Sequence, residues 1–328
     1  MRGLTRAHGK VFANGQMNEI RDVFCVSIER LIAKIKEKNN PSVAGLDPVL
    51  TYIPSFIKKE SFEKYGKNLK GAADAVFAFN KGLIDGLYDV VPAVKPQAAY
   101  YEMYGFYGME AFYKTIAYAK EKGLYVIADV KRNDIGSTAE AYAKAYLGRT
   151  EVDGEEFEPF GADSVTLNPY LGTDSIVPFL DKCETYQKSV FVLVKTSNKS
   201  SGELQDVETK DGTVYLTSAS LVNRWGMPGE CGYSNVGAVV GATYPEQAAV
   251  IRKALPHAYF LVPGYGAQGG GARDVVPCFN SDGLGAIVNS SRGIMCAYQR
   301  NHLPEEEYAQ AARAEAIRMR DEIMGAIG

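Results

Sequence analysis

Two carboxylates and a lysine lie close together in the segment Asp129-Val-Lys-Arg-Asn-Asp134. The segment follows an apolar run at residues 124–128, which predicts a strand, and side chains two apart on a strand point to one face. We therefore expect Asp129 and Lys131 to share a face, with Asp134 in the turn beyond, able to fold back over them. A surface ion pair would show i, i+4 helical spacing, and burial of three charges is costly. The array predicts a catalytic site, and a structural charge cluster at a strand end is the alternative.

The neighbours of Lys131 indicate its role. A lysine that forms a Schiff base is usually found in an apolar pocket or beside another cation, whereas flanking carboxylates favour the ammonium form. Lys131 is therefore expected to be a cation that donates a proton.

Eight short, nearly continuous apolar segments predict strands that are buried on both faces, and most stretches between them have helical periodicity. Eight βα units in one chain indicate a (β/α)₈ barrel; a doubly wound sheet is the alternative, but the regular spacing favours closure. A helix at residues 20–38 precedes the barrel, and residues 198–235 are interpreted as an insertion after the fifth strand, a lid or a dimer element. The predicted strands are residues 42–46, 90–94, 124–128, 164–167, 190–194, 236–240, 258–262 and 285–288.

Nearly every predicted strand ends in a polar or glycine-rich cluster, and in a barrel these ends converge on the rim that carries active sites. The seventh strand is followed by a glycine-rich loop, residues 263–271, and the eighth by Arg292. Backbone amides of glycines and a two-pronged arginine suit a phosphate group. The loop also matches G-x-G-x-x-G at Gly264, Gly266 and Gly269, but a dinucleotide motif normally opens the first βαβ unit. A purely structural glycine turn is the third interpretation.

The histidines and cysteines do not suit a metal centre. The three histidines are His8, His257 and His302, none of which is expected on the active rim, so no histidine triad or histidine-rich metal site can be assembled there. The five cysteines are far apart and form no C-x-x-C pair, which indicates a reducing cytoplasm. Magnesium on Asp129 and Asp134 is the remaining alternative, although lysines would compete for those carboxylates. We expect no metal and no cofactor.

Composition narrows the classes of partner. The formal net charge of −3 comes from 36 basic and 39 acidic residues without long runs, which gives no electrostatic support for nucleic acid or a membrane surface. No apolar run reaches the length of a membrane helix. Residues 1–16 are expected to be a disordered leader or extension, with Met17 as a candidate start and residues 17–328 as one catalytic domain.

Two local patterns predict structural roles. The aromatic-rich segment at residues 100–113 is interpreted as packing or a subunit interface. Ser137 and Glu140 fit a capping box that would begin the third barrel helix and fix the direction of Thr138.

The string Asp129-x-Lys131-x-x-Asp134-Ile135-x-x-Thr138 closely resembles the signature of the orotidine 5′-phosphate decarboxylase family. Other matching residues follow in the family's order. The resemblance covers residues 42–292, and the long segment after the fifth strand is similar to the larger bacterial branch. The sequence departs from shorter members at residues 289–291, which stand where those have a glycine before the arginine. The further matching residues are Asp47, Lys95, Ser197, Pro263, Gln268 and Arg292.

The resemblance implies roles for these residues. Asp47 would bind ribose, Lys95 would belong to the charged array, and Ser197 would lie beside the pyrimidine. Loop residues Pro263 and Gln268, with the glycines and Arg292, would hold the base and the phosphate. Lys131 would stabilise and protonate a C6 carbanion, beside Asp129 and the Asp134 of a partner subunit. Ile135 and Thr138 would reach that neighbour's site.

The implied activity is decarboxylation of orotidine 5′-phosphate to UMP without a cofactor, the last step of UMP synthesis, in a cytoplasmic homodimer with shared active sites. The aspartate and lysine pattern is also found in 3-keto-L-gulonate 6-phosphate decarboxylase and hexulose 6-phosphate synthase, which lack the combination of Ile135, Thr138 and the Gly-Ala-Gln loop. A non-catalytic nucleotide-binding barrel is the alternative from another class.

Overall fold

The computed structural model describes residues 26–210, 212–266 and 269–328, so the expected leader at residues 1–16 lies outside the described residues. Eight parallel strands form a closed barrel in the order β1-β12-β11-β10-β7-β6-β3-β2, which confirms the predicted (β/α)₈ class. These strands are β1 Ser42–Leu46, β2 Ala93–Pro96, β3 Tyr125–Arg132, β6 Ser164–Leu167, β7 Ser189–Lys195, β10 Ser234–Val240, β11 Ala258–Val262 and β12 Ala286–Ser290.

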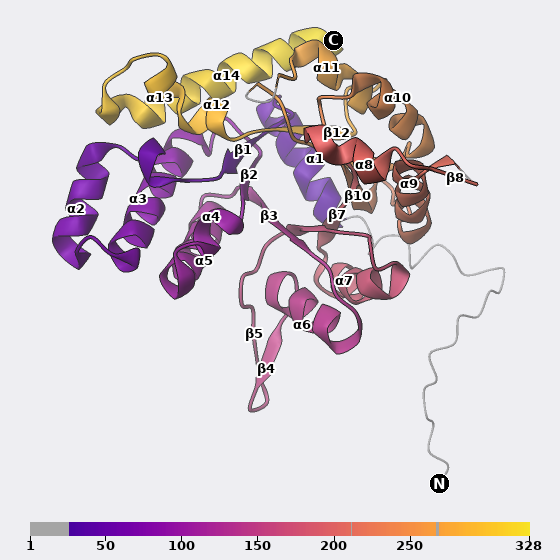
Figure 1. Ribbon diagram of the computed structural model, residues 1–328, viewed down its shortest axis with the longest axis horizontal. Coiled ribbons are helices and arrows are strands. Elements are labelled where there is room, and N and C mark those ends of the chain that lie inside the picture. The colour runs from indigo at the N-terminus through magenta and orange to yellow at the C-terminus, as the bar shows by residue number, and fades with distance from the viewer. Residues whose placement is uncertain (1–25, 211, 267–268) are drawn as a thin grey trace.

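Helices surround the barrel (Figure 1). The longest, α14, packs on α3 and on the short helices that follow β11 and β12. Among the described residues, no helix combines the length and apolar character needed to cross a bilayer. The helices are α1 Val26–Lys38, α2 Ser55–Tyr65, α3 Leu69–Leu87, α4 Ala99–Glu102, α5 Gly105–Glu121, α6 Gly136–Tyr146, α7 Thr173–Tyr186, α8 Gly202–Gln205, α9 Val214–Trp225, α10 Pro245–Ala254, α11 Ala272–Val275, α12 Arg292–Met295, α13 Ala297–Arg300 and α14 Tyr308–Ile327.

Helix α1 packs against the barrel interior. Its apolar residues Ile28, Leu31 and Ile35 recur at helical spacing and belong to the same buried cluster as Tyr125 and Tyr259. The Ser27 hydroxyl lies 3.0 Å from that of Tyr125. This packing fills one end of the barrel, so the carboxyl ends of the strands are left for a site.

The segment interpreted as an insertion at residues 198–235 has two parts. Its first part contains α8 and the small hairpin of β8 Glu208–Thr209 and β9 Gly212–Thr213. Its second part contains α9, which packs on β7 and β10 as an ordinary barrel helix. The insertion after the fifth strand is therefore confirmed but shorter than the sequence pattern indicated. Tyr215, Ala219 and Val222 are the buried residues of α9 and have helical spacing, which serine and threonine neighbours obscure.

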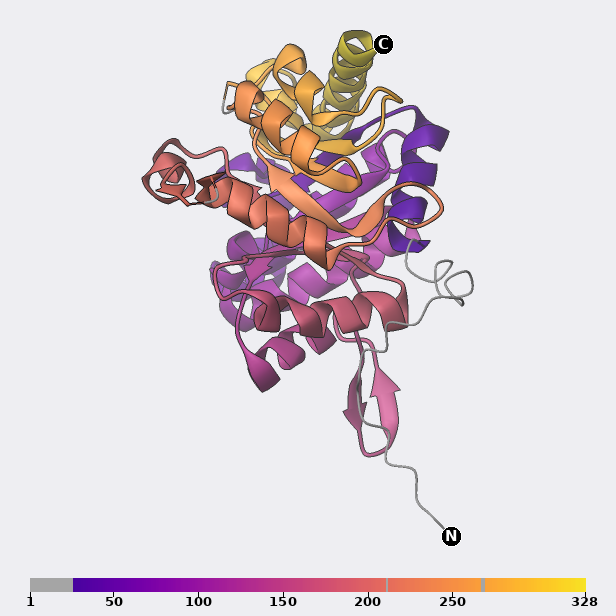
Figure 2. The same cartoon turned by 90° about the vertical axis from the view of Figure 1, so that its right-hand side faces the viewer.

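A second hairpin, β4 Thr150–Val152 with β5 Glu155–Phe157, projects away from the barrel in both views (Figures 1 and 2). It follows α6 and precedes β6, so the chain enters it before a strand rather than after one. It therefore lies on the side of the barrel that carries the amino ends of the strands, opposite the carboxyl ends.

Of two local expectations, the first is wrong and the second is confirmed for the buried aromatic residues. The predicted capping box is wrong, because α6 begins at Gly136 and its N-cap residue, Ile135, has no side-chain capping hydrogen bond. The aromatic-rich segment does not have one role: Tyr101 and Phe112 are buried and pack edge to face, whereas Phe106 is 77% exposed. Tyr100 faces the cavity described next.

Candidate active site

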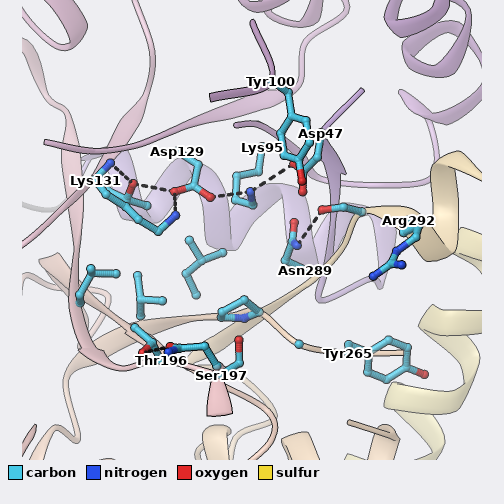
Figure 3. A pocket seen from close by; sticks show the side chains of 18 of the residues that line it. Asp47, Lys95, Tyr100, Asp129, Lys131, Thr196, Ser197, Tyr265, Asn289 and Arg292 are labelled. Atoms are coloured by element: carbon cyan, nitrogen blue, oxygen red, sulfur yellow. Dashed lines mark hydrogen bonds and ion pairs between the residues drawn. The ribbon is translucent and has the colours of Figure 1, made fainter. Parts of the chain in front are cut away.

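A cavity of about 620 Å³ opens at the carboxyl ends of the barrel strands (Figure 3). Its size falls in the range of small-molecule sites, roughly 300–1,000 Å³. The cavity is lined by residues from Asp47 to Met295, 248 positions apart in sequence, because parallel strands in a barrel all end at one rim. Eight residues singled out in the sequence line it: Asp47, Lys95, Asp129, Lys131, Ser197, Pro263, Gly264 and Arg292.

Asp129 binds two lysines at once. Its Oδ2 lies 2.7 Å from Lys95 Nζ, and its Oδ1 lies 2.5 Å from Lys131 Nζ. The side chains of Lys95 and Asp129 are 5% and 8% exposed, whereas that of Lys131 is 42% exposed. Lys131 is therefore the member of the array that is most open to a ligand.

Thr166 on β6 holds the end of β3 in place. Its hydroxyl donates to Asp129 Oδ1 at 2.8 Å and accepts from the backbone amides of Val130 and Lys131 at 3.0 and 2.9 Å. The pairing of β3 with β6 shifts register there, and Lys131 has a φ of +47°, a conformation unfavourable for a residue with a Cβ. The simple strand alternation expected from sequence therefore ends before Lys131, but its ammonium still reaches Asp129.

Charge pairing outweighs burial in this array. Burial by itself would raise the pKa of Asp129, but Lys95 and Lys131 hold that pKa well below its usual range. Burial by itself would lower the pKa of Lys95, but Asp129 and Asp47 outweigh it, so that pKa is raised. Both buried groups are therefore charged at neutral pH, and neither is available as a neutral acid or base.

Asp47, at the end of β1, extends the array towards β12. Its Oδ1 lies 3.8 Å from Lys95 Nζ and is buried without a hydrogen-bond partner. The neighbouring Gly45 has to be glycine, because a Cβ there would lie 1.9 Å from Ser291 Oγ. Asn289 donates to that same hydroxyl at 3.2 Å and lies between Asp47 and Arg292 (Figure 3). Residues 289–291 thus occupy space that Gly45 leaves open.

The other end of the cavity carries Arg292 and the glycine-rich loop. Arg292 is exposed, and its guanidinium makes no hydrogen bond or ion pair with any residue that the structure describes. Gly264 has a φ of +99°, and the amide of Gly270 donates to its carbonyl at 3.2 Å. Tyr265 donates to Glu322 Oε2 on α14 at 2.7 Å, which fixes the start of the loop to that helix.

The wall across the barrel from β2 and β3 is neutral. It combines the apolar side chains of Leu193, Val239 and Leu261 with the polar residues Thr196 and Ser197. A ligand in this cavity would meet charges on one side and a mainly apolar surface on the other.

Several predicted site residues do not reach this cavity. Asp134 accepts a hydrogen bond from the amide of Ile135 at 2.8 Å, and Ile135 is 53% exposed. Neither residue lines the cavity, nor do Thr138, Gly266 and Gly269. The expectation that Asp134 folds back over Asp129 and Lys131 of its own chain is therefore wrong. Gln268 lies outside the described residues.

Several polar residues of the cavity were not predicted from the sequence, among them Thr166, Tyr100 and Asn289. Thr166 lies inside an apolar strand, Tyr100 lies in an aromatic-rich segment, and Asn289 was noted only as a departure from a glycine pattern. The position of Thr166 directly before the end of a barrel strand was the available signal, since side chains there face the rim.

Comparison with known proteins gives consistent results. Residues 79–305 match the model of the orotidine 5′-phosphate decarboxylase / HUMPS family. The chain is 45% identical over 273 residues to the orotidine 5′-phosphate decarboxylase of Caldicellulosiruptor bescii, covering 83% of this chain and 90% of the relative. It is 44% identical over 303 residues to that of Rhodopirellula baltica, covering 90% and 98%. The solved structure of Leishmania donovani OMP decarboxylase is similar with a TM-score of 0.70 and 30% identity, covering 92% of this chain and 98% of that one.

Proposed function

This chain belongs to the orotidine 5′-phosphate decarboxylase / HUMPS family and is a carboxy-lyase, and we propose that it removes CO₂ from orotidine 5′-phosphate in the cavity between Lys131 and Arg292. The observation that carries this proposal is the arrangement of charge. Lys95, Asp129 and Lys131 are paired on one side of the cavity, and Arg292, without an ion pair to any described residue, lies at its other end. The lysine–aspartate array is placed to react with a pyrimidine, and Arg292 is placed to bind a phosphate.

The proposed reaction runs through Lys131. The bond between C6 and the carboxylate breaks, its electron pair stays on C6, and CO₂ leaves. The Lys131 ammonium stabilises the developing carbanion and then transfers one proton to C6, which gives UMP and a neutral amine that solvent reprotonates. A fixed charge of this kind needs no rearrangement during the reaction and is the strongest form of transition-state stabilisation available here.

Asp129 has two functions in this scheme. It holds the Lys131 ammonium at 2.5 Å, and its own negative charge would lie beside the substrate carboxylate, which disfavours the bound substrate relative to the carbanion. Lys95, paired with Asp129 and 3.8 Å from Asp47, would link the array to the ribose bound by Asp47.

Phosphate binding is assigned to Arg292 and the glycine-rich loop. The guanidinium can make two parallel hydrogen bonds to phosphate oxygens, and Pro263 and Gly264 line the same end of the cavity. Gly266, Gly269 and Gln268 are proposed to complete the loop around the ligand. The phosphate is remote from C6, so these contacts supply binding energy rather than chemistry.

The site is proposed to be shared between two subunits. Three residues that closely follow Lys131 in sequence do not line the cavity of their own chain: Asp134, Ile135 and Thr138. The side chain of Ile135 is exposed. In a homodimer these residues would enter the partner's site, where Asp134 of the partner subunit would flank Lys131 opposite Asp129. The ammonium would then lie between two carboxylates.

An exposed apolar surface supports such a dimer. Large side chains are exposed in the segments that follow β2, β3 and β6, three strands that are neighbours in the barrel. Arg132 pairs with Glu102, and Asn133 donates to the carbonyl of Asn168, so the three loops are joined to one another. Large apolar side chains exposed on neighbouring segments are typical of interaction sites. The exposed residues are Met103 at 52%, Phe106 at 77%, Ile135 at 53%, Tyr170 at 77% and Leu171 at 45%.

Sedimentation tests the dimer. The wild-type protein is expected to sediment as a dimer, and the double variant Ile135→Asp, Tyr170→Asp as an inactive monomer. Val250→Asp is the control, because Val250 is 46% exposed on α10, which follows β10 on the other side of the barrel. A double variant that stays dimeric would place the interface elsewhere.

The direct test of the function is the conversion of orotidine 5′-phosphate by purified protein in EDTA. Loss of substrate absorbance with equal amounts of UMP and CO₂ is expected. Inactivity on this substrate, with magnesium-dependent turnover of 3-keto-L-gulonate 6-phosphate, would contradict the proposal and favour the sugar-phosphate relatives.

A further inference from the structure

Gln205, at the end of α8, makes two hydrogen bonds to one residue of the cavity wall. Its Oε1 accepts from the backbone amide of Thr196 at 3.0 Å, and its Nε2 donates to the Thr196 hydroxyl at 2.7 Å. The hydroxyl in turn donates to Asn198 Oδ1 at 2.7 Å. Thr196, Ser197 and Asn198 all line the cavity, whereas Gln205 does not. A residue outside the site thus fixes the backbone of Thr196 inside it and, through the Thr196 hydroxyl, is linked to the side chain of Asn198.

Asp206, the residue that follows α8, is anchored by a buried charge. Lys195 Nζ lies 2.7 Å from Asp206 Oδ1, and the Lys195 side chain is 1% exposed. The ammonium also lies 4.7 Å from the ring centroid of Tyr244, and Gln247 donates to the same Asp206 oxygen at 3.2 Å. A buried ammonium that loses its carboxylate is strongly destabilising, so this pair holds the end of α8 against β7 and α10.

The loop after β10 supports the wall from its other side. Thr243 donates to the carbonyl of Ser197 at 3.1 Å. Gly241 packs so closely that a Cβ there would lie 2.8 Å from the Ser197 amide nitrogen and Cα. The wall is therefore fixed between α8 and this loop, and the segment after β7 is a support for the site rather than a free lid.

We propose that Gln205 is a positioning residue that sets the Thr196–Ser197–Asn198 wall against the base of the bound nucleotide, with Lys195 and Asp206 anchoring Gln205. This inference rests on the proposed function for the identity of the ligand. It assigns to the inserted part of the chain a role in recognising the pyrimidine half of the substrate, while the phosphate end is built from β11 and β12.

The first experiment compares Gln205→Met with the wild type. Methionine retains the length of the side chain but loses both hydrogen bonds. We expect UMP binding to weaken about tenfold, the loss of about 1.4 kcal/mol, because the wall no longer has one fixed conformation. Binding of ribose 5-phosphate, which has no base, is expected to stay within twofold. Equal losses for both ligands, or no loss for UMP, would overturn the proposal.

Two further variants separate positioning from general damage. Glu203→Met places the same residue in α8 at an exposed position without a described contact, and it is expected to bind UMP like the wild type. Gln205→Glu keeps an acceptor for the Thr196 amide and is expected to recover most of the affinity for UMP. If Gln205→Glu were as weak as Gln205→Met, the amide contact would not be the one that matters.

A measurement without ligand keeps this inference separate from the proposed function. The Thr196 amide has the Gln205 side chain as its acceptor, so its hydrogen exchange in the ligand-free protein should accelerate in Gln205→Met but not in Glu203→Met. Unchanged exchange would remove Gln205 from this role. If exchange accelerates but the wild type fails to convert orotidine 5′-phosphate, the proposed function fails and the support of the wall by Gln205 stands.

Discussion

The two ends of the cavity differ in how their charges are used. At the β2–β3 end, Lys95 and Lys131 contact Asp129 at 2.7 and 2.5 Å, and the side chains of Lys95 and Asp129 are almost fully buried. At the β11–β12 end, Arg292 is exposed and has no ion pair to a described residue, and the nearby loop offers glycine backbone. The charged groups at the first end are paired with one another. The second end offers hydrogen-bond donors that suit an anion.

One barrel rim can therefore separate the residues that do chemistry from those that bind. A buried network keeps its geometry because each charge depends on the others, so it can present a fixed ammonium to a reacting atom. An exposed arginine loses little by exchanging water for phosphate. Variants at the first end should therefore affect turnover and stability, and those at the second should affect affinity.

The largest effect is expected for Lys131→Ala. Loss of the proton donor should lower kcat by about a thousandfold or more, since general acid catalysis is worth up to about 10⁴. UMP binding and the thermal transition should largely survive, because Lys131 is the most exposed member of the network. Steady-state kinetics with calorimetry checks both. Retention of a tenth of the wild-type kcat would remove Lys131 from the mechanism.

Asp129→Ala should combine lost turnover with lost stability. It leaves the buried Lys95 without its closest carboxylate, so the free energy of unfolding should fall by about 3 kcal/mol, the lower end for a broken buried pair. Urea unfolding at pH 7 measures this change. A stability equal to wild type would mean that the network does not depend on its pairs.

The same variant has a defined pH dependence. Because the pKa of Asp129 is depressed in the folded protein, its stabilisation is complete above its unfolded pKa, about 3.9, and is lost as pH falls towards the folded value. The raised pKa of Lys95 gives stabilisation that is complete below about 10.4 and is lost at higher pH. The stability difference between wild type and Asp129→Ala should thus be constant from pH 5 to 9 and shrink below about pH 4.

At the other end, Arg292→Ala should weaken UMP binding by about 1.5–3 kcal/mol, or roughly ten- to a hundredfold, the usual scale for hydrogen bonds to a charged group. The unfolding free energy should not change, since the side chain is exposed. Calorimetric titration with UMP and with uridine separates the phosphate from the nucleoside. Equal weakening for the two ligands would contradict the assignment.

The smallest effect is expected for Thr166→Val. It removes the hydroxyl that joins Asp129 to the amides of Val130 and Lys131, so stability should fall by about 1 kcal/mol and kcat by several-fold. Thr166→Ser retains the hydroxyl and should behave nearly like the wild type. A Thr166→Val enzyme with full turnover would show that Lys131 is held in place without the Thr166 hydroxyl.

Most of the barrel was predictable because its signals are local. Strands buried on both faces give continuous apolar runs such as residues 258–262, which is the extent of β11 in the structure. Helix α9 was hidden because its buried residues alternate with serines and threonines, and the start of α6 was misplaced because the expected Ser137 cap does not form.

The site was predictable where function demands charged residues at strand ends, as at Lys95 and Asp129. It was not predictable where a residue acts through a neighbour on another strand. Thr166 bonds to β3 from β6, and Gln205 bonds to Thr196 across the turn after β7. Such pairings are set by the register of strands and by loop conformation, which residue types alone do not reveal.

In the proposed shared site, Lys131 lies between Asp129 of its own chain and Asp134 of the partner subunit. Mixing Lys131→Ala and Asp134→Ala chains, each nearly inactive alone, under conditions that allow subunit exchange tests this arrangement. In a two-fold heterodimer one site collects both lesions and the other collects neither. The control mixes Lys131→Ala with Asp129→Asn, two residues in contact within one chain, which cannot restore a site.

Random pairing makes half of the dimers heterodimers, and half of their sites are intact, so the first mixture should recover roughly a quarter of the wild-type activity. The control mixture should stay inactive. A first mixture that also stays inactive after demonstrated exchange would show that each site is built from one chain, and Asp134 would lose its place beside Lys131.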